Sequence, residues 1–253
     1  MISINYKQSI HDQCLFYKSI ANQTTYVLVH VDDLLVMAED AIGLENFYKD
    51  FRQCYAEITI SQGDVINYLG MSIRSGHKDG EIRVSQAGYV GQMLERFGVS
   101  KTSKYPSDAN LFKTMDINNE LVDKIDYLSK VMSIMYLAKR SRPDLLMETV
   151  FAATKSSDPR RQDDMALMKL FEYINATRDL ELVFIVNELQ VFAYVDAGYA
   201  VHGDGKSHTG AIISMGPDGG TVFAKSGKQK LVTCSSTEAE FTTLWDMQYM
   251  SET

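Results

Sequence analysis

The chain has 253 residues, of which 45% are hydrophobic and 23% charged, values typical of a globular protein with one large or two modest domains. Its formal net charge of −8 argues against a simple nucleic-acid-binding protein, although lysines and arginines cluster locally and can attract phosphate there. The sequence predicts no transmembrane segment, no secretory signal and no metal-ligand spacing of its three cysteines. We therefore expect an intracellular protein, cytoplasmic or nuclear, without membrane contact.

The first third of the chain alternates predicted strands with one helix. Runs of β-forming residues at 25–29 and 34–37 flank Asp32 and Asp33, so a hairpin is predicted with both acids at its tip. Apolar residues at helical spacing predict an amphipathic helix over 42–55. The predicted order is ββαβββ, an α+β arrangement, with the later strands at 58–60, 65–73 and 82–85 and a hairpin turn at 76–80.

The middle of the chain is predicted to be helical. Residues 86–97 place apolar side chains on one helical face, and Gly98 suits the end of that helix. A polar connection is predicted over 100–119. Three further helices are predicted, whose apolar stripes indicate a packed core: one over 125–136, one after Pro143 and one around 167–174.

The last part of the chain returns to strands and then closes with a helix. Each predicted strand is a short apolar run bounded by polar or glycine-rich residues. Strands are predicted at 182–186, 190–195, 209–214 and 221–225, a turn at 216–220 and a helix at 235–250.

The Asp32–Asp33 pair is the first candidate site. Two adjacent carboxylates about 4 Å apart repel each other by roughly 4 kcal/mol at an effective dielectric constant of about 20. A divalent cation relieves this repulsion, and a metal held on a strand–turn–strand can build a phosphoryl-transfer site. Aspartate also favours turns for backbone reasons alone. The pair by itself therefore leaves a plain Asp–Asp turn open.

Asp196 and Glu240 form the second candidate site. Asp196 ends a predicted strand and Glu240 lies in the first turns of the last helix, so the two carboxylates can approach and share a divalent metal. Ser235 and Glu238, and likewise Thr237 and Glu240, also have the spacing of a helix capping box. We interpret Glu238 as a cap, and for Glu240 both roles stay open.

Seven short blocks in a fixed order connect these two sites. The first four resemble the reverse transcriptase of copia-type LTR retrotransposons, and the last three resemble the ribonuclease H region of the same polyprotein. The resemblance covers nearly the whole chain, in the blocks Val31–Leu35, Tyr68–Ile73, Val84–Val90, Met135–Ala138 with Ser141–Asp144, Tyr194–Ala200, Lys206–Gly210 and Ser235–Phe241.

The resemblance implies a fold and a set of domains. It implies an α+β fold in which 1–85 form a partial reverse-transcriptase palm and 86–180 form a helical thumb and connection. Residues 181–253 then form a truncated, mixed α/β domain similar to ribonuclease H. In this scheme Leu69 and Gly70 belong to the strand that supports the primer end.

The resemblance also implies site residues and ligands. Asp32 and Asp33 match the polymerase metal motif, and Asp196 and Glu240 match the first two ribonuclease H carboxylates. The implied chemistry is two-metal phosphoryl transfer with Mg²⁺ or Mn²⁺, namely RNA-directed DNA synthesis and hydrolysis of the RNA strand. The implied partners are a primer–template or RNA–DNA hybrid, dNTP and other segments of the pol polyprotein.

Several positions depart from the family pattern. His30 stands where an aromatic residue is usual, and Gly198 where a second aspartate is frequent. The third polymerase carboxylate belongs to an earlier strand, and the next ribonuclease H aspartate to a strand after the last helix. We interpret Asp246 as a surface residue and not as a replacement.

These departures set the expectation for activity. With part of each ligand set, the isolated chain is expected to have little or no polymerase or nuclease activity. Two alternatives stay open. The chain is a non-enzymatic nucleic-acid-binding or protein-interaction module derived from the transposon, or another chain supplies the remaining carboxylates.

Overall fold

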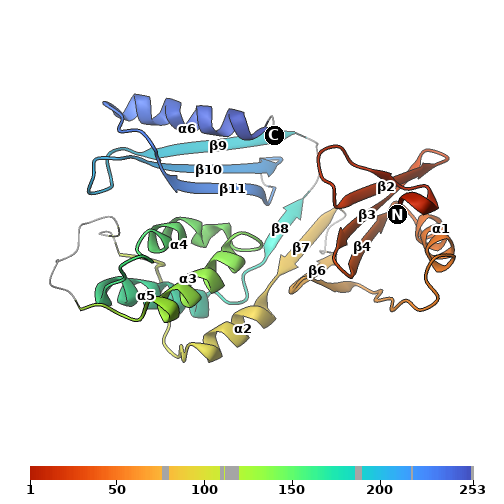
Figure 1. Cartoon of the computed structure of the whole chain (residues 1–253), viewed down its shortest axis with the longest axis horizontal. Helices are drawn as coiled ribbons and strands as arrows, with labels where there is room; N and C mark the ends of the chain where they lie inside the picture. Colours follow the sequence, from red (N-terminus) through yellow and green to blue (C-terminus); the bar gives the residue numbers. More distant parts are fainter. Residues whose placement is uncertain (76–79, 109–110, 112–119, 186–189, 218, 252–253) are drawn as a thin grey trace. The chain divides into compact units, whose positions relative to one another are not determined.

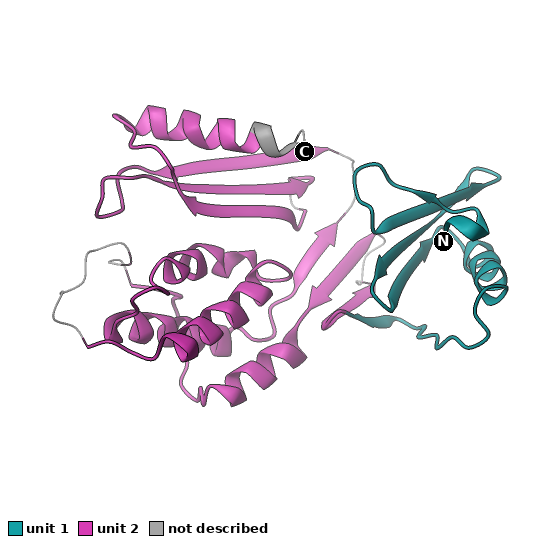
Figure 2. Ribbon diagram, viewed as in Figure 1, with its two compact units in different colours: residues 1–68, 253 teal, residues 69–252 magenta. Residues whose placement is uncertain are grey.

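The computed structural model describes residues 1–253 except 76–79, 109–110, 112–119, 186–189, 218 and 252–253, and the side chains of 248–251 (Figure 1). The described residues form a mixed α+β structure with three antiparallel sheets and six α-helices, as the sequence predicted in outline. Residues 1–68 and 69–252 form two compact units (Figure 2). Residues 76–79 of the predicted turn at 76–80 and half of the polar connection predicted at 100–119 fall outside the described residues.

The first unit is an antiparallel sheet with one helix. The sheet order is β1-β2-β3-β4, and the predicted hairpin and helix are confirmed. The strand predicted at 58–60 is wrong, because this segment pairs with no strand and lines a hollow beside α1. The elements are β1 (Lys7–Gln8), β2 (Leu15–Ile20), β3 (Gln23–His30), β4 (Asp33–Ala38), α1 (Ala41–Arg52) and β5 (Val65–Tyr68), preceded by a 3₁₀ turn at Ile2–Ile4.

Close packing of α1 fixes the hairpin that carries the acidic pair. Asp40 caps the helix by accepting a hydrogen bond from the Gly43 N–H at 2.8 Å. A Cβ at Gly43 would lie 2.8 Å from the Cβ of Ala38 and 2.9 Å from Oγ1 of Thr25. Only glycine therefore allows the helix to approach β3 and β4 this closely. Beneath it the buried side chains form a small core of Ile4, Tyr6, Val27 and Phe47.

The strand predicted over 65–73 is interrupted in the structure. Leu69 and Gly70 both have positive φ, at 49° and 71°, the sign that a type I′ turn requires at its two central positions. The Tyr136 hydroxyl donates a hydrogen bond to the Leu69 carbonyl at 2.7 Å. Leucine gives no turn signal in the sequence, so this break was not predictable from it.

The second unit contains the predicted helices and a sheet. All four helical predictions are confirmed, and their apolar faces form one core that includes Tyr127, Val131, Leu137, Leu170 and Phe171. The elements are β6 (Met71–Ser75), β7 (Glu81–Ser85), α2 (Ala87–Arg96), α3 (Lys124–Ala138), a 3₁₀ turn (Pro143–Leu145), α4 (Leu146–Ala153), α5 (Arg161–Ala176) and β8 (Leu182–Ile185). Strands β6, β7 and β8 pair antiparallel, so β8 joins a strand about a hundred positions earlier in the sequence.

The remaining sheet carries the second candidate site. Its order is β11-β10-β9, and α6 packs on β9 and β10 (Figure 1). The predicted strands and helix are confirmed with small shifts of their ends. The elements are β9 (Val191–Gly198), β10 (His208–Met215), β11 (Thr221–Lys228) and α6 (Ser236–Ser251). In the described part of the chain, no helix is long and apolar enough to cross a membrane.

Candidate functional site

Asp32 and Asp33 lie at the end of the β3–β4 hairpin. His30 pairs with Asp33 across the two strands, so the loop consists of Val31 and Asp32 alone. Val31 has a φ of 53° and is 83% exposed. A β-branched residue in the left-handed region is strained by roughly 1–3 kcal/mol. The strained loop leaves both carboxylates, and also His30, exposed to solvent.

Tyr68 is a candidate that sequence reasoning missed. Its side chain is buried, and its hydroxyl has no hydrogen-bond partner among the described residues. Burial raises the pKa of this hydroxyl, and the charges of Asp33 and Cys14 raise it further. A buried polar group without a partner costs about 1–3 kcal/mol, so its persistence points to a ligand or water beside Asp33. Its one sequence signal was its place at the start of the Tyr68–Ile73 block.

Glu240 lies directly beside the strand that carries Asp196. Oε1 of Glu240 accepts a hydrogen bond from the backbone N–H of Ala197 at 3.2 Å. Ala197 pairs with Thr209, whose hydroxyl is hydrogen-bonded to that of Thr243 on α6, so both residues face the helix. Side chains alternate along a strand, which turns the exposed Asp196 toward the opposite face. The structure thus places Glu240 against the backbone next to Asp196.

Glu238 and Glu240, the two candidate caps at the start of α6, have different roles in the structure. Glu238 accepts a hydrogen bond from the Cys234 N–H at 2.6 Å, and the Ser235 hydroxyl accepts one from the Glu238 N–H at 3.2 Å. Glu238 is therefore a cap, as predicted. Glu240 reaches β9 instead. Asp246 is partly exposed and forms an ion pair with Lys225 at 3.2 Å, as expected of a surface residue.

The ligand chemistry of both sites suits a hard cation. Carboxylate oxygens are the ligands that Mg²⁺ prefers, and both members of the hairpin pair are open to solvent. Within the described ranges, however, no group of three or more His, Cys, Asp or Glu side chains is arranged to hold a metal ion. The hairpin therefore offers two adjacent carboxylates, whereas Asp196 and Glu240 lie toward opposite faces of β9 and are not brought together in the structure.

A buried histidine pair lies next to the strand that carries Asp196. His208 begins β10, and His202 lies in the loop between β9 and β10. Nε2 of His202 lies 3.0 Å from Nδ1 of His208, and Nε2 of His208 lies 2.7 Å from the Ser226 hydroxyl. Burial, together with the nearby His202, lowers the pKa of His208 to about 4. Burial also lowers the pKa of His202, as do Lys228 and Lys155. The pair is therefore neutral at pH 7.

This pair predicts a loss of stability in acid. Unfolding returns His208 to an ordinary pKa near 6.5, so below that pH the unfolded chain binds a proton that the folded chain excludes. Lowering the pH from about 7 to about 5 should cost about 2 kcal/mol of unfolding free energy. Denaturant melts across this range check it, with His208→Gln expected to show a shallower pH dependence. Equal pH dependence in both proteins would contradict the prediction.

The Ser141–Asp144 block is structural. The Arg142 side chain is almost fully buried, and Nε and Nη2 donate to the two Asp144 oxygens at 2.9 and 2.8 Å. The same guanidinium donates to the Thr177 carbonyl and hydroxyl at 2.9 and 2.8 Å, at the end of α5. Ser141 donates to Oε1 of Gln86 at 2.8 Å, before α2. The block ties three helices together, which explains its presence without a catalytic role.

Comparisons with known proteins find similarity to Pol polyproteins of transposons over most of the chain. The chain is similar to a retrovirus-related Pol polyprotein from transposon TNT 1-94 of Nicotiana tabacum, with 26% identity over 95% of the chain. A putative transposon Ty5-1 protein of Saccharomyces cerevisiae is 23% identical over 90% of the chain and 74% of its own length. A protein named secreted RxLR effector protein 161, from Plasmopara viticola, is 33% identical over 47% of the chain and 84% of its own length.

The chain corresponds to a small part of the tobacco polyprotein. The chain spans 19% of the length of the tobacco polyprotein. No family model matches the chain. No solved structure matches it either.

Proposed function

We propose that the chain is a copia-type segment of a transposon Pol polyprotein that carries parts of a reverse transcriptase and of a ribonuclease H, which its similarity to retrovirus-related Pol polyproteins supports. One observation supports the proposal: Asp32, in a strained two-residue hairpin loop, and Asp33, at the start of β4, are adjacent acids that are both exposed to solvent and so open to a cation. In this proposal 1–85 are palm, 86–180 thumb and connection, and 181–253 the ribonuclease H-like part.

The polymerase part rests on the hairpin. Asp32 and Asp33 would hold Mg²⁺ or Mn²⁺, which when bound would neutralise charge on the reacting phosphates. The hairpin itself supplies rigidity, because α1 packs closely on both strands at Gly43. The hydroxyl of Tyr68 has no hydrogen-bond partner among the described residues, and the charge of Asp33 raises its pKa, so we propose that it donates to a ligand of this site.

The ribonuclease H part rests on Glu240 and Asp196. The Ala197 N–H holds one oxygen of Glu240, which orients the carboxylate and leaves its other oxygen to meet a cation. The hairpin offers two carboxylates, and Asp196 and Glu240 face opposite sides of β9, so both sites would bind a divalent ion more weakly than a full ligand set. We therefore propose that the chain alone turns over slowly and that a longer Pol product is active.

Binding of an RNA–DNA hybrid tests this proposal on the chain itself. Fluorescence anisotropy with a labelled hybrid should show an affinity that falls with salt and rises when Mg²⁺ is added, because the cation bridges carboxylate and phosphate. The Asp196→Asn/Glu240→Gln variant should lose the Mg²⁺-dependent part and keep the rest. An affinity that Mg²⁺ leaves unchanged in the unmodified chain contradicts the proposal.

A non-enzymatic module is the second candidate. The match to a protein named as a secreted effector is the observation that favours it, since that name specifies no polymerase. Such a module would bind the hybrid in a salt-dependent manner, without any effect of Mg²⁺ and without turnover in a longer product. The same anisotropy series therefore separates the two candidates.

A further inference from the structure

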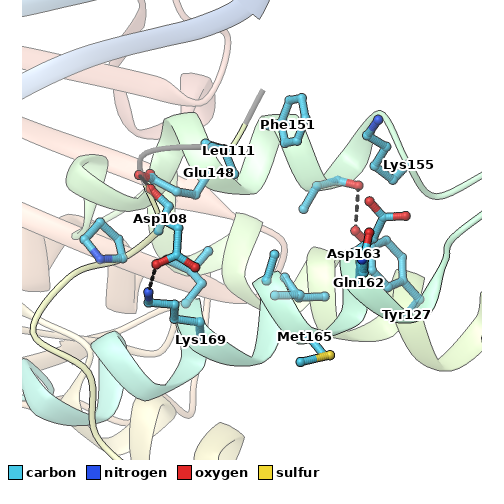
Figure 3. Close-up of a pocket in the computed structure, with 16 residues that line it drawn as sticks. Asp108, Leu111, Tyr127, Glu148, Phe151, Lys155, Gln162, Asp163, Met165 and Lys169 are labelled. Atoms are coloured by element: carbon cyan, nitrogen blue, oxygen red, sulfur yellow. Dashed lines mark hydrogen bonds and ion pairs between the residues drawn. The ribbon is translucent and has the colours of Figure 1, made fainter. Parts of the chain in front are cut away.

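A pocket of about 430 Å³ lies among the helices of the second unit, and none of the four carboxylates of the proposed function lines it. Helices α3, α4 and α5, together with residues 106–108 and Leu111, form its walls (Figure 3). Its volume falls in the range of small-molecule sites, which are mostly apolar with a few polar groups. The apolar wall consists of Phe151, Ala152, Leu167 and Leu170, all of them buried.

Glu148 and Asp163 are two buried acids that line this pocket, and Glu148 is the one that no helix cap engages. It lies in the first turn of α4 and is 6% exposed, and its Oε1 accepts a hydrogen bond from the Ser107 hydroxyl at 3.1 Å. Within the described part of the chain, no lysine or arginine forms an ion pair with it. The two lysines of the pocket are engaged elsewhere. Lys169 pairs with Asp108, and the Lys155 ammonium lies 5.1 Å from the centre of the Phe151 ring.

The electrostatics of Glu148 agree with an uncompensated charge. Burial raises the pKa of its carboxyl, and nearby Asp144 raises it further, while hydrogen bonds from the backbone and from Ser107 lower it. The net rise means that the protein alone does not fully stabilise the carboxylate. A positive group delivered by a ligand would do so in surroundings of low dielectric, where a charge-assisted hydrogen bond is strongest.

We propose that this pocket binds a small amphipathic amine, whose ammonium group pairs with Glu148 and whose apolar body packs against Phe151, Leu167 and Leu170. The arrangement supplies what such a ligand needs: a buried carboxylate outside any helix cap, an apolar wall and a cavity of drug-like volume. Asp163, which also lines the pocket, accepts a hydrogen bond from the Arg160 N–H as part of a helix cap, so Glu148 is the anchor.

The probe is 4-phenylbutylamine, with 4-phenylbutanol as its neutral counterpart. Ligand-observed NMR titration should give saturable binding of the amine with a Kd on the order of millimolar, typical of a fragment of this size. The alcohol should bind at least about tenfold more weakly, because it lacks the charge that pairs with Glu148. This comparison uses the unmodified chain and is independent of how any variant folds.

The variant series assigns the effect to one carboxylate. Glu148→Gln keeps the shape and an acceptor for Ser107 but removes the charge, so it should weaken the amine at least about tenfold and leave the alcohol unchanged. Glu95→Gln removes an exposed charge on α2, outside the pocket, and should leave both ligands unchanged. Equal affinity of amine and alcohol, no saturable binding, or an amine affinity unaffected by Glu148→Gln would each overturn the proposal.

Discussion

In a Pol product that contains this chain, Asp32→Asn/Asp33→Asn is expected to lower primer extension at least about 100-fold while leaving hybrid cleavage within about twofold. Asparagine keeps the size of each side chain but removes both charges that would hold the divalent cation. A metal ion contributes several kcal/mol of transition-state stabilisation, and each 1.36 kcal/mol is a factor of about ten in rate.

The reciprocal variant makes this prediction specific. Asp196→Asn/Glu240→Gln should lower hybrid cleavage by a similar factor and spare primer extension, because the two carboxylate pairs lie in separate compact units. Both activities are measured on the same preparations with Mg²⁺. Loss of both activities in either variant, or undiminished extension after Asp32→Asn/Asp33→Asn, would contradict the assignment of the two sites.

Arg142→Ala is expected to lower the free energy of unfolding by about 3–5 kcal/mol. The guanidinium is buried and makes four hydrogen bonds, to Asp144 and to the end of α5 at Thr177. Its removal leaves Asp144 with the Tyr173 hydroxyl as a donor and the Thr177 carbonyl with the Leu180 N–H, and opens a cavity beside the helical core. Urea denaturation followed by circular dichroism measures the change.

Arg161→Ala is the matched control for that measurement. Arg161 begins α5, its side chain is 68% exposed, and it forms an ion pair with Glu120 at 3.4 Å. Pairs of this kind contribute about 0–1 kcal/mol, so this variant should stay within about 1 kcal/mol of the unmodified chain. Similar losses of unfolding free energy for the two variants would show that the Arg142 hydrogen bonds do not hold α5 to the segment after α3.

Elements with a regular apolar period were predictable from the sequence. The helices α2 to α5 follow such periods, and the hairpin of β3 and β4 follows from two β-forming runs around a polar pair. The strand predicted at 58–60 failed because β propensity without a partner strand does not make a sheet. The break at Leu69–Gly70 requires a positive φ at Leu69, and leucine rarely adopts this conformation, so the sequence did not predict it.

Contacts between segments that are distant in the sequence could not be predicted from it. The pairing of β7 with β8, the reach of Glu240 to the Ala197 backbone and the network from His202 to Ser226 all join segments that fold together only in three dimensions. Capping chemistry is local, so the cap role of Glu238 was predictable. The acidic pair was found through its residue types, whereas Tyr68 emerged only from its burial.

The most direct test of the account is a Mn²⁺ titration of this chain followed by NMR. Paramagnetic broadening should appear first at the amides around Asp32 and Asp33 and around Asp196 and Glu240, and should be competed by Mg²⁺. Asp32→Asn/Asp33→Asn should remove the first set of effects and leave the second. Broadening that is spread evenly over exposed acids, or that survives this double substitution at the hairpin, would contradict the claim that these carboxylates form divalent-cation sites.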